Sequence, residues 1–146
     1  MKKLFCATLI LFVLLSCLTA CNFTKNTSGE FAGEAEATPK VEEMMTALAE
    51  SNTDAAKAFM HPEVVERSDN AIAQISDYLS GRGATAINMK SINVKTSTGT
   101  SGKTRQEQVA YQVTLNDDEV IYLNVTYLSN DSGTGFLSFQ IVLGAI

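Results

Sequence analysis

The chain has 146 residues, and its 11 Lys and Arg against 16 Asp and Glu give a formal net charge of −5 at pH 7. Nucleic acids and anionic lipid surfaces reward clustered Lys and Arg, which this acidic chain lacks. We therefore predict no nucleic-acid partner and no charge-driven membrane binding. The length suits one small folded domain beside its terminal segments.

The first 21 residues have the layout of a secretory signal. Lys2 and Lys3 form a short positive end, residues 4–15 are mostly apolar, and small residues precede Cys21. The apolar run is too short for a stable membrane span. The segment resembles a bacterial lipoprotein leader, which implies a signal peptide over 1–20 and acylation of Cys21, with palmitate among the acyl chains. The mature protein would then lie in the bacterial cell envelope, lipid-anchored and facing outside the cytoplasm.

Two alternatives to this leader remain. An uncleaved N-terminal anchor helix is disfavoured, because the apolar run is short and no stop-transfer segment follows it. Cleavage before Cys17 would put Leu15 near the cut, where Thr19 in the other box fits better, and it would shorten the apolar core. All three cysteines, Cys6, Cys17 and Cys21, lie in this leader. We therefore expect no disulfide and no cysteine metal site in the mature chain.

Residues 21–37 are predicted to be a flexible tether. They are polar and small, with Phe23 and Phe31 as the only large apolar side chains, and cannot offset the entropy cost of ordering. Such a coil has an r.m.s. reach of about 22 Å, which would hold a domain clear of the bilayer. We place the folded domain at 38–146, and the mature chain keeps 9 basic against 16 acidic residues.

Helical periodicity predicts three helices at the start of the domain. Thr38 is the expected N-cap of the first helix and Pro39 its first helical position. Residues 51–54 end this helix and cap a short second one, and the third helix follows 68–69. Their apolar stripes should face a core: Val41, Met44, Met45 and Leu48 in the first helix, and Ile72, Ile75, Tyr78 and Leu79 in the third.

After residue 83 the periodicity changes from 3.6 to 2, which is typical of strands. Turn-forming segments separate four strands, so we expect an α+β domain in which the helices cover the apolar face of an antiparallel meander. The first strand changes parity between Met89 and Ile92, which predicts a β-bulge near Lys90 and Ser91. The face predicted to meet the helices is Val109, Tyr111, Val113, Leu115, Ile121, Leu123, Val125, Tyr127, Leu137, Phe139, Ile141 and Leu143.

Three helices followed by a bent meander resemble the nuclear transport factor two-like, or cystatin-like, α+β cone. Residues 47–63 look like the passage by which small exported members enter their second helix. The family includes ketosteroid isomerases, dehydratases, transport factors and exported lipoproteins, so the resemblance implies a fold and leaves the function open. The cone between helices and sheet is a candidate pocket for a small apolar ligand, lined by Phe59, Tyr78, Met89, Tyr111 and Tyr127.

The predicted inner face carries no carboxylate or imidazole, whereas the similar enzymes place an Asp, Glu or His inside the cone to abstract a proton. His61, the single histidine, would need Glu63 or Asp54 to orient it, and its place at a helix end favours a structural role. The acidic run 117–119 lacks the ligand spacing of a calcium loop, and 101–104 lacks the upstream glycine of a phosphate loop. We therefore predict no catalytic residues, no metal and no cofactor.

The opposite face of the predicted sheet carries no charge, although exposed sheet faces often use Lys and Glu for solubility. A solvated Thr- and Gln-rich face and a contact surface explain this composition equally well. The favoured function is a membrane-anchored, non-enzymatic interaction module that forms a homodimer or binds an envelope protein. A carrier of a small apolar ligand is the alternative, and an isomerase- or dehydratase-type enzyme is least favoured. The candidate interface residues are Gln112, Tyr122, Asn124, Thr126, Phe136 and Gln140.

Overall fold

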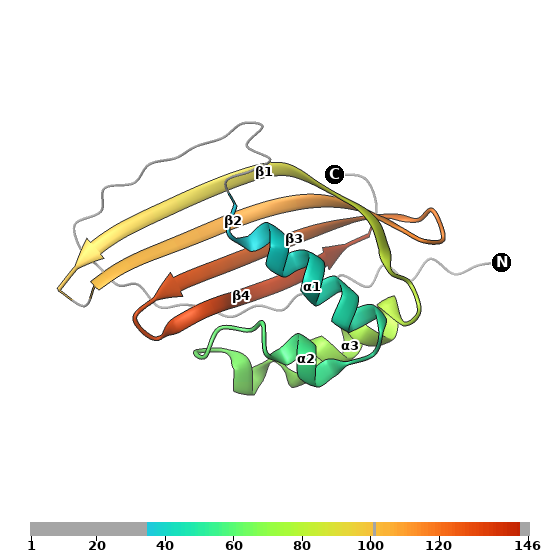
Figure 1. Ribbon diagram of the computed structural model, residues 1–146, viewed down its shortest axis with the longest axis horizontal. Coiled ribbons are helices and arrows are strands. Elements are labelled where there is room, and N and C mark those ends of the chain that lie inside the picture. The colour runs from blue at the N-terminus through green and yellow to red at the C-terminus, as the bar shows by residue number, and fades with distance from the viewer. Residues whose placement is uncertain (1–34, 101, 144–146) are drawn as a thin grey trace.

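The computed structural model describes residues 35–100 and 102–143. The predicted leader with its three cysteines, and most of the predicted tether, lie outside the described residues. The elements are α1 (Ala37–Ala49), α2 (Thr53–Lys57), a 3-10 turn (Val65–Arg67), α3 (Asp69–Leu79), β1 (Ala84–Gly99), β2 (Gly102–Leu115), β3 (Val120–Asn130) and β4 (Gly133–Val142). The strands form one antiparallel sheet in the order β1-β2-β3-β4. The predicted α+β architecture is confirmed, with α1 lying across one face of a curved sheet and α2 and α3 beside it (Figure 1).

The first helix buries the predicted stripe but begins earlier than predicted. Val41, Met44, Met45 and Leu48 are all buried against the sheet side of the molecule. The helix starts at Ala37, and Ala35 and Ala37 are already buried, so the end of the predicted tether lies in the folded part. The predicted N-cap at Thr38 and first helical position at Pro39 are therefore wrong, because the Glu36 and Ala37 N–H groups already donate to the Glu107 carboxylate on β2. No helix among the described residues is long and apolar enough to cross a membrane.

The two later helices follow the predicted signals. The Asn52 side chain accepts a hydrogen bond from the Ala55 N–H at 3.1 Å and caps α2. In α3, Ile72, Ile75 and Leu79 are buried, and Tyr78 is half-buried at the helix end. A neighbouring serine ties α3 to α1, since the buried Ser76 hydroxyl donates to the Leu48 carbonyl at 3.1 Å.

Strand pairing places the apolar side chains in cross-strand rows on the inner face. One such row is Met89, Tyr111, Leu123 and Ile141, and the next is Ile92, Val109, Val125 and Phe139. The register of β1 and β2 shifts between Met89 and Ser91, which leaves Lys90 as the extra residue. The β-bulge predicted from the change of parity is confirmed.

A second β-bulge, which the alternation did not predict, moves Phe136 to the inner face. Thr126 pairs with Ser138 and Tyr127 pairs with Phe136, so Leu137 is the extra residue of β4. Phe136 is 0% exposed, and its ring meets the rings of Tyr127 and Phe139 edge to face, with centroids 5.1 and 5.5 Å apart. The prediction that Phe136 belongs to the outer, interface-forming face is therefore wrong.

Leu143 is a second correction to the predicted inner face. It follows the end of β4 at Val142 and is 39% exposed. Alternation continues in the sequence, but the strand ends first, so Leu143 has no neighbouring strand to hold it over the core. The remaining predicted inner-face residues are buried.

A short segment after α2 extends the sheet at its β4 edge. Met60 pairs with Phe136 in parallel, with the His61 N–H donating to the Phe136 carbonyl and the Phe136 N–H donating to the Phe59 carbonyl, both at 2.9 Å. Gly135 allows this approach, because a Cβ there would lie 2.6 Å from the His61 nitrogen. The pairing supplies partners to backbone groups that the edge strand would otherwise expose.

Candidate binding face

The middle of the sheet face away from the helices is built from three cross-strand rows of uncharged side chains, and the row beyond Asn93 brings the exposed Lys95 to the same face. We call these twelve residues the outer sheet face. The rows are Asn88, Gln112, Tyr122 and Val142; then Ser91, Ala110, Asn124 and Gln140; then Asn93, Gln108, Thr126 and Ser138. Period-2 alternation puts them opposite the core rows, since successive side chains of a strand point to opposite faces.

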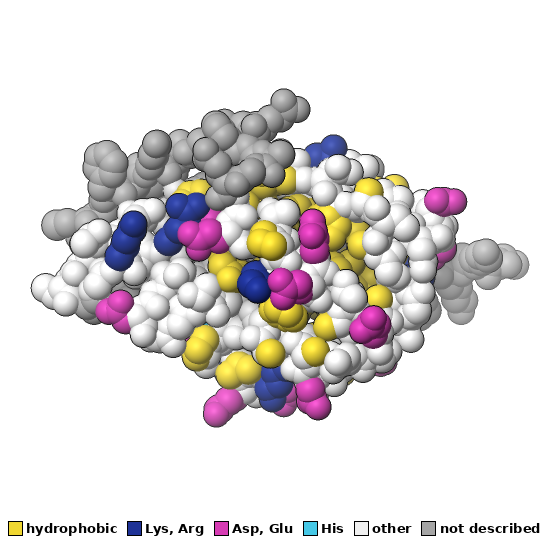
Figure 2. All heavy atoms as spheres, in the orientation of Figure 1, with side chains coloured by type: hydrophobic (Ala, Val, Ile, Leu, Met, Phe, Trp, Pro, Cys, Tyr) yellow, Lys and Arg dark blue, Asp and Glu magenta, His cyan; other side chains and the backbone are white. Residues whose placement is uncertain are grey.

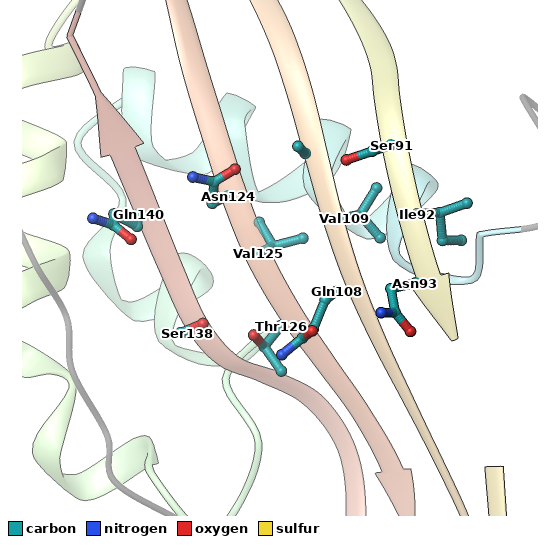
Figure 3. Close-up of a pocket in the computed structure, with 11 residues that line it drawn as sticks. Ser91, Ile92, Asn93, Gln108, Val109, Asn124, Val125, Thr126, Ser138 and Gln140 are labelled. Carbon is teal, nitrogen blue, oxygen red and sulfur yellow. The ribbon is translucent and has the colours of Figure 1, made fainter. Parts of the chain in front are cut away.

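The middle of the outer sheet face is hollowed. A concavity of about 440 Å³ is bordered by side chains of all four strands, and Figure 3 shows Asn124, Gln140, Thr126 and Gln108 around it. Ala110 carries the smallest side chain of the central row, and its neighbour on β1 is the short Ser91. The hollow exists because these two small residues sit between longer amides. It lies within the range of roughly 300–1,000 Å³ typical of small-molecule sites.

Three apolar residues at the floor of this hollow belong to the core. Ile92, Val109 and Val125 line the concavity but are each only 3% exposed, and their row faces the helices. They therefore meet the hollow through backbone atoms rather than through their side chains. The side chains that a ligand would touch are amides, hydroxyls and the Ala110 methyl group.

One polar atom in the wall of this hollow has no partner. Among the described residues, Asn93 Oδ1 is buried and accepts no hydrogen bond. Buried polar atoms are nearly always hydrogen-bonded, so such an atom needs an explanation. Because this oxygen is also closed to solvent, a molecule in the open hollow would reach it only after the Asn93 amide turned.

Five of the six candidate interface residues lie on the outer sheet face. Gln112, Tyr122, Asn124, Thr126 and Gln140 belong to its three rows and are half-buried by their neighbours. Loss of Phe136 to the core leaves Tyr122 as the single aromatic side chain among the twelve. The face is thus more polar than alternation alone predicts.

The candidate pocket residues are spread along the core rather than gathered around one space. The Tyr78 hydroxyl donates to Glu119 Oε1 at 3.0 Å, just before β3 begins. Tyr127 follows Glu119 by eight residues, which span roughly 26 Å in an extended strand. Tyr78 and Tyr127 are therefore at opposite ends of the inner face.

The other three candidate pocket residues are already engaged or partly exposed. The ring of Phe59 lies 5.8 Å from Lys40 Nζ, and Met89 is half-buried on β1 opposite Tyr111. The Tyr111 hydroxyl lies 3.0 Å from the Thr38 hydroxyl. Burial raises the pKa of Tyr111 to about 12, opposed by the bond to Thr38 and aided by nearby carboxylates, Glu107 among them.

His61 is a fully buried side chain with both ring nitrogens engaged. The Glu63 N–H donates to Nδ1 at 3.2 Å, so Nδ1 carries no hydrogen, and Nε2 donates to Asn130 Oδ1 at 3.1 Å. The Asn130 amide in turn donates to the Glu63 carboxylate at 3.2 Å. These bonds tie the segment after α2 to the end of β3, and they leave no free ring nitrogen facing a cavity.

Glu107 is a buried carboxylate that sequence reasoning missed. It is 1% exposed and shares an inner-face row with Val94, Tyr127 and Phe136. The predicted inner face of β2 began at Val109, whereas the strand starts at Gly102, so the prediction that this face carries no carboxylate is wrong. The sequence did contain a signal: residues 107, 109 and 111 are two positions apart, so their side chains point to the same face of a strand.

The Glu107 carboxylate holds the first turn of α1. Oε1 accepts from the Glu36 N–H at 3.2 Å, and Oε2 accepts from the Ala37 N–H at 3.1 Å. Arg105 donates to Oε1 from Nε at 3.0 Å and from Nη2 at 2.7 Å. A carboxylate engaged by a guanidinium and by helix N-terminal donors acts as a cap supplied from the sheet.

The acidic β2–β3 turn is bound by an arginine rather than arranged around an ion. Arg82 contacts Asp117 at 3.3 Å and also Glu119, while its guanidinium lies 4.3 Å from the ring of Tyr78. The Asp117 carboxylate accepts the Glu119 N–H at 3.2 Å. Within residues 35–100 and 102–143, no group of three or more His, Cys, Asp or Glu side chains is placed to hold a metal ion.

Comparison with known proteins adds nothing to these observations, because no family model, curated protein or solved structure matches the chain. The resemblances to a lipoprotein leader and to the nuclear transport factor two-like cone remain predictions from the sequence. Function is therefore inferred from the leader and from the chemistry of the outer sheet face.

Proposed function

We propose that the protein is a lipid-anchored, extracytoplasmic, non-enzymatic interaction module that binds an envelope component through the outer sheet face. One observation carries the proposal: twelve neighbouring side chains on four strands include no charge, although 18% of the chain is charged. Acidic and basic side chains are scattered over the helix-covered face (Figure 2). Interface cores are depleted of charge in this way, because desolvating an ion is costly.

The anchor rests on the sequence of the leader. Lipid on Cys21 and a tether would hold the domain near the membrane and raise its effective concentration toward other envelope components. The order of three helices and a four-stranded meander supports a place in the nuclear transport factor two-like family.

One observation supports a non-enzymatic reading. Among the described residues, the buried carboxylate of Glu107 and the buried imidazole of His61 are each held by hydrogen bonds to backbone or side-chain partners. A general base needs an unengaged atom within reach of its substrate proton.

The hollow makes the outer sheet face a poor fit to a second copy of itself. Two copies meeting face to face across a two-fold axis would bring two hollows together and enclose unfilled space. With Tyr122 as the single aromatic residue, such a dimer would also lack an apolar centre. A partner that projects polar groups into the hollow is a better match than a second copy.

The lipid anchor predicts a specific processing defect. Wild-type protein extracted from membranes should have an intact mass that lacks residues 1–20 and includes acyl chains on Cys21. Cys21→Ser should accumulate as the uncleaved precursor, because the acceptor thiol is missing. Cys17→Ser is the matched control and should be processed normally. An N-terminus at Cys17, or an unmodified Cys21, would show that the leader is assigned incorrectly.

The proposed location and contact face can be tested together by thiol labelling, because the chain has no cysteine after Cys21. Gln140→Cys places a thiol on the outer sheet face, and Gln74→Cys places one on the exposed surface of α3. In cells whose outer layers are permeable but whose cytoplasm is closed, an impermeant maleimide should label Gln74→Cys. Gln140→Cys should be protected in these cells and become reactive after purification in detergent.

The two thiols separate the two halves of the proposal. If Gln74→Cys reacts only after the cytoplasm is opened, the extracytoplasmic location is wrong. If Gln140→Cys reacts equally fast in cells and in detergent, the outer sheet face is solvated and binds nothing there.

A further inference from the structure

We propose that the hollow of the outer sheet face is a binding site for a neutral saccharide, a ligand of uncharged rings bearing hydroxyl groups. The inference rests on the proposed function, because it names the class of envelope component that this face would bind. It is carried by the hollow itself and by the kinds of polar group around it.

The hydrogen-bonding groups around the hollow match hydroxyl groups. Four side-chain amides, of Asn93, Gln108, Asn124 and Gln140, each offer two donors and an acceptor. Sugar hydroxyls also donate and accept at once, so neighbouring amides can serve each hydroxyl in both senses. Hydroxyls of Ser91, Thr126 and Ser138 add further mixed donors and acceptors.

The lining disfavours charged ligands. The hollow itself has no charged side chain to neutralise an ion; Lys90 and Lys95 are exposed on β1 outside its lining. Burying an ionic group against amides alone would leave it without a counter-charge. An uncharged polar ligand avoids this cost.

Tyr122 lies beside the hollow, just outside its lining. It lies in the row next to the hollow and two residues from Asn124 on the same strand. A tyrosine ring combines an apolar face with a polar tip, which suits the C–H face of a sugar ring beside its hydroxyls. Ala110 keeps the floor open, since a larger side chain there would occupy the hollow.

The test uses the full processed chain in a detergent whose headgroup is not a sugar, titrated with the neutral disaccharides cellobiose and N,N′-diacetylchitobiose. Nuclear magnetic resonance should show shifts of the side-chain amide signals of Gln108 and Asn124, and none for the exposed Gln74 on α3. Digalacturonate, an anionic disaccharide, should bind more weakly. Ala110→Leu should fill the hollow and weaken binding about tenfold or more, as expected when two hydrogen bonds are lost.

Gln108→Leu removes one amide from the site without filling the hollow. If Ala110→Leu fails to fold, the binding measured for Gln108→Leu decides whether the hollow is the saccharide site. Gln74→Leu is the matched control and should bind as the wild type does. The proposal is overturned if neither disaccharide shifts the outer-face amides, or if both variants bind normally. If the protein instead dimerises through this face and Tyr122→Lys abolishes the dimer, the saccharide proposal is overturned. The proposed interaction module would still stand. Failure of the module itself would appear separately, as full reactivity of Gln140→Cys in cells.

Discussion

Gly135→Ala is expected to lower the free energy of unfolding by about 3 kcal/mol and the melting temperature by roughly 10 °C. A Cβ at this position would lie 2.6 Å from the His61 nitrogen and 2.7 Å from the Met60 carbonyl carbon. Both are backbone atoms, so no side-chain rotation relieves the clash. The chain after α2 must move away from β4 and give up its two hydrogen bonds to Phe136.

Thermal unfolding followed by circular dichroism measures this change. Gly83→Ala is the matched control, because a Cβ there has no atom within 4 Å. It should change stability by less than about 1 kcal/mol. Hydrogen exchange should also show that Gly135→Ala selectively exposes the His61 amide. Equal melting temperatures for the two variants would contradict the close packing of this segment on β4.

Sequence reasoning succeeds where one periodicity decides the structure. The stripe of Val41, Met44, Met45 and Leu48 has a single helical interpretation, and all four side chains are buried. The bulge at Lys90 was visible because the apolar residues on either side, Met89 and Ile92, differ in parity. In both places the spacing of the apolar residues is enough to predict the local structure.

The same reasoning fails where two adjacent residues are both apolar. Phe136 and Leu137 stand side by side in the sequence, so either one can continue the inward alternation. The bulge puts Phe136 on the inner face, where it meets Tyr127 and the segment at Met60. That choice depends on long-range packing between β4 and the chain after α2, which periodicity does not record.

The hollow needed the register of the strands as well as their alternation. Ser91 and Ala110 lie 19 positions apart in the sequence, and only pairing between β1 and β2 brings these small residues together. The bulge at Lys90 contributes, because it sets which β1 residue faces Ala110. The uncharged character of the face was predictable from the sequence, but its concave shape was not.

Glu107→Ala is expected to lower the free energy of unfolding by about 3 kcal/mol. The carboxylate accepts hydrogen bonds from two backbone N–H groups and from Arg105, and it is nearly inaccessible to water. Removing it leaves the N–H groups of Glu36 and Ala37 without this partner at the start of α1. Buried donors that lose a charged acceptor are costly because no water replaces it.

Glu107→Gln separates the charge from the shape. The amide keeps one acceptor oxygen but turns an NH₂ group toward a donor. Glu107→Gln should therefore lower the free energy of unfolding by about half as much as Glu107→Ala. Glu50→Gln is the control, because Glu50 is an exposed glutamate at the other end of α1. It should change the free energy of unfolding by less than about 0.5 kcal/mol.

Hydrogen exchange distinguishes a helix cap from a general packing residue. In both Glu107 variants, the Ala37 amide should exchange faster than the amides in the middle of α1, since only the first turn loses its partner. Uniform exchange along α1, or unchanged stability in Glu107→Ala, would contradict the cap.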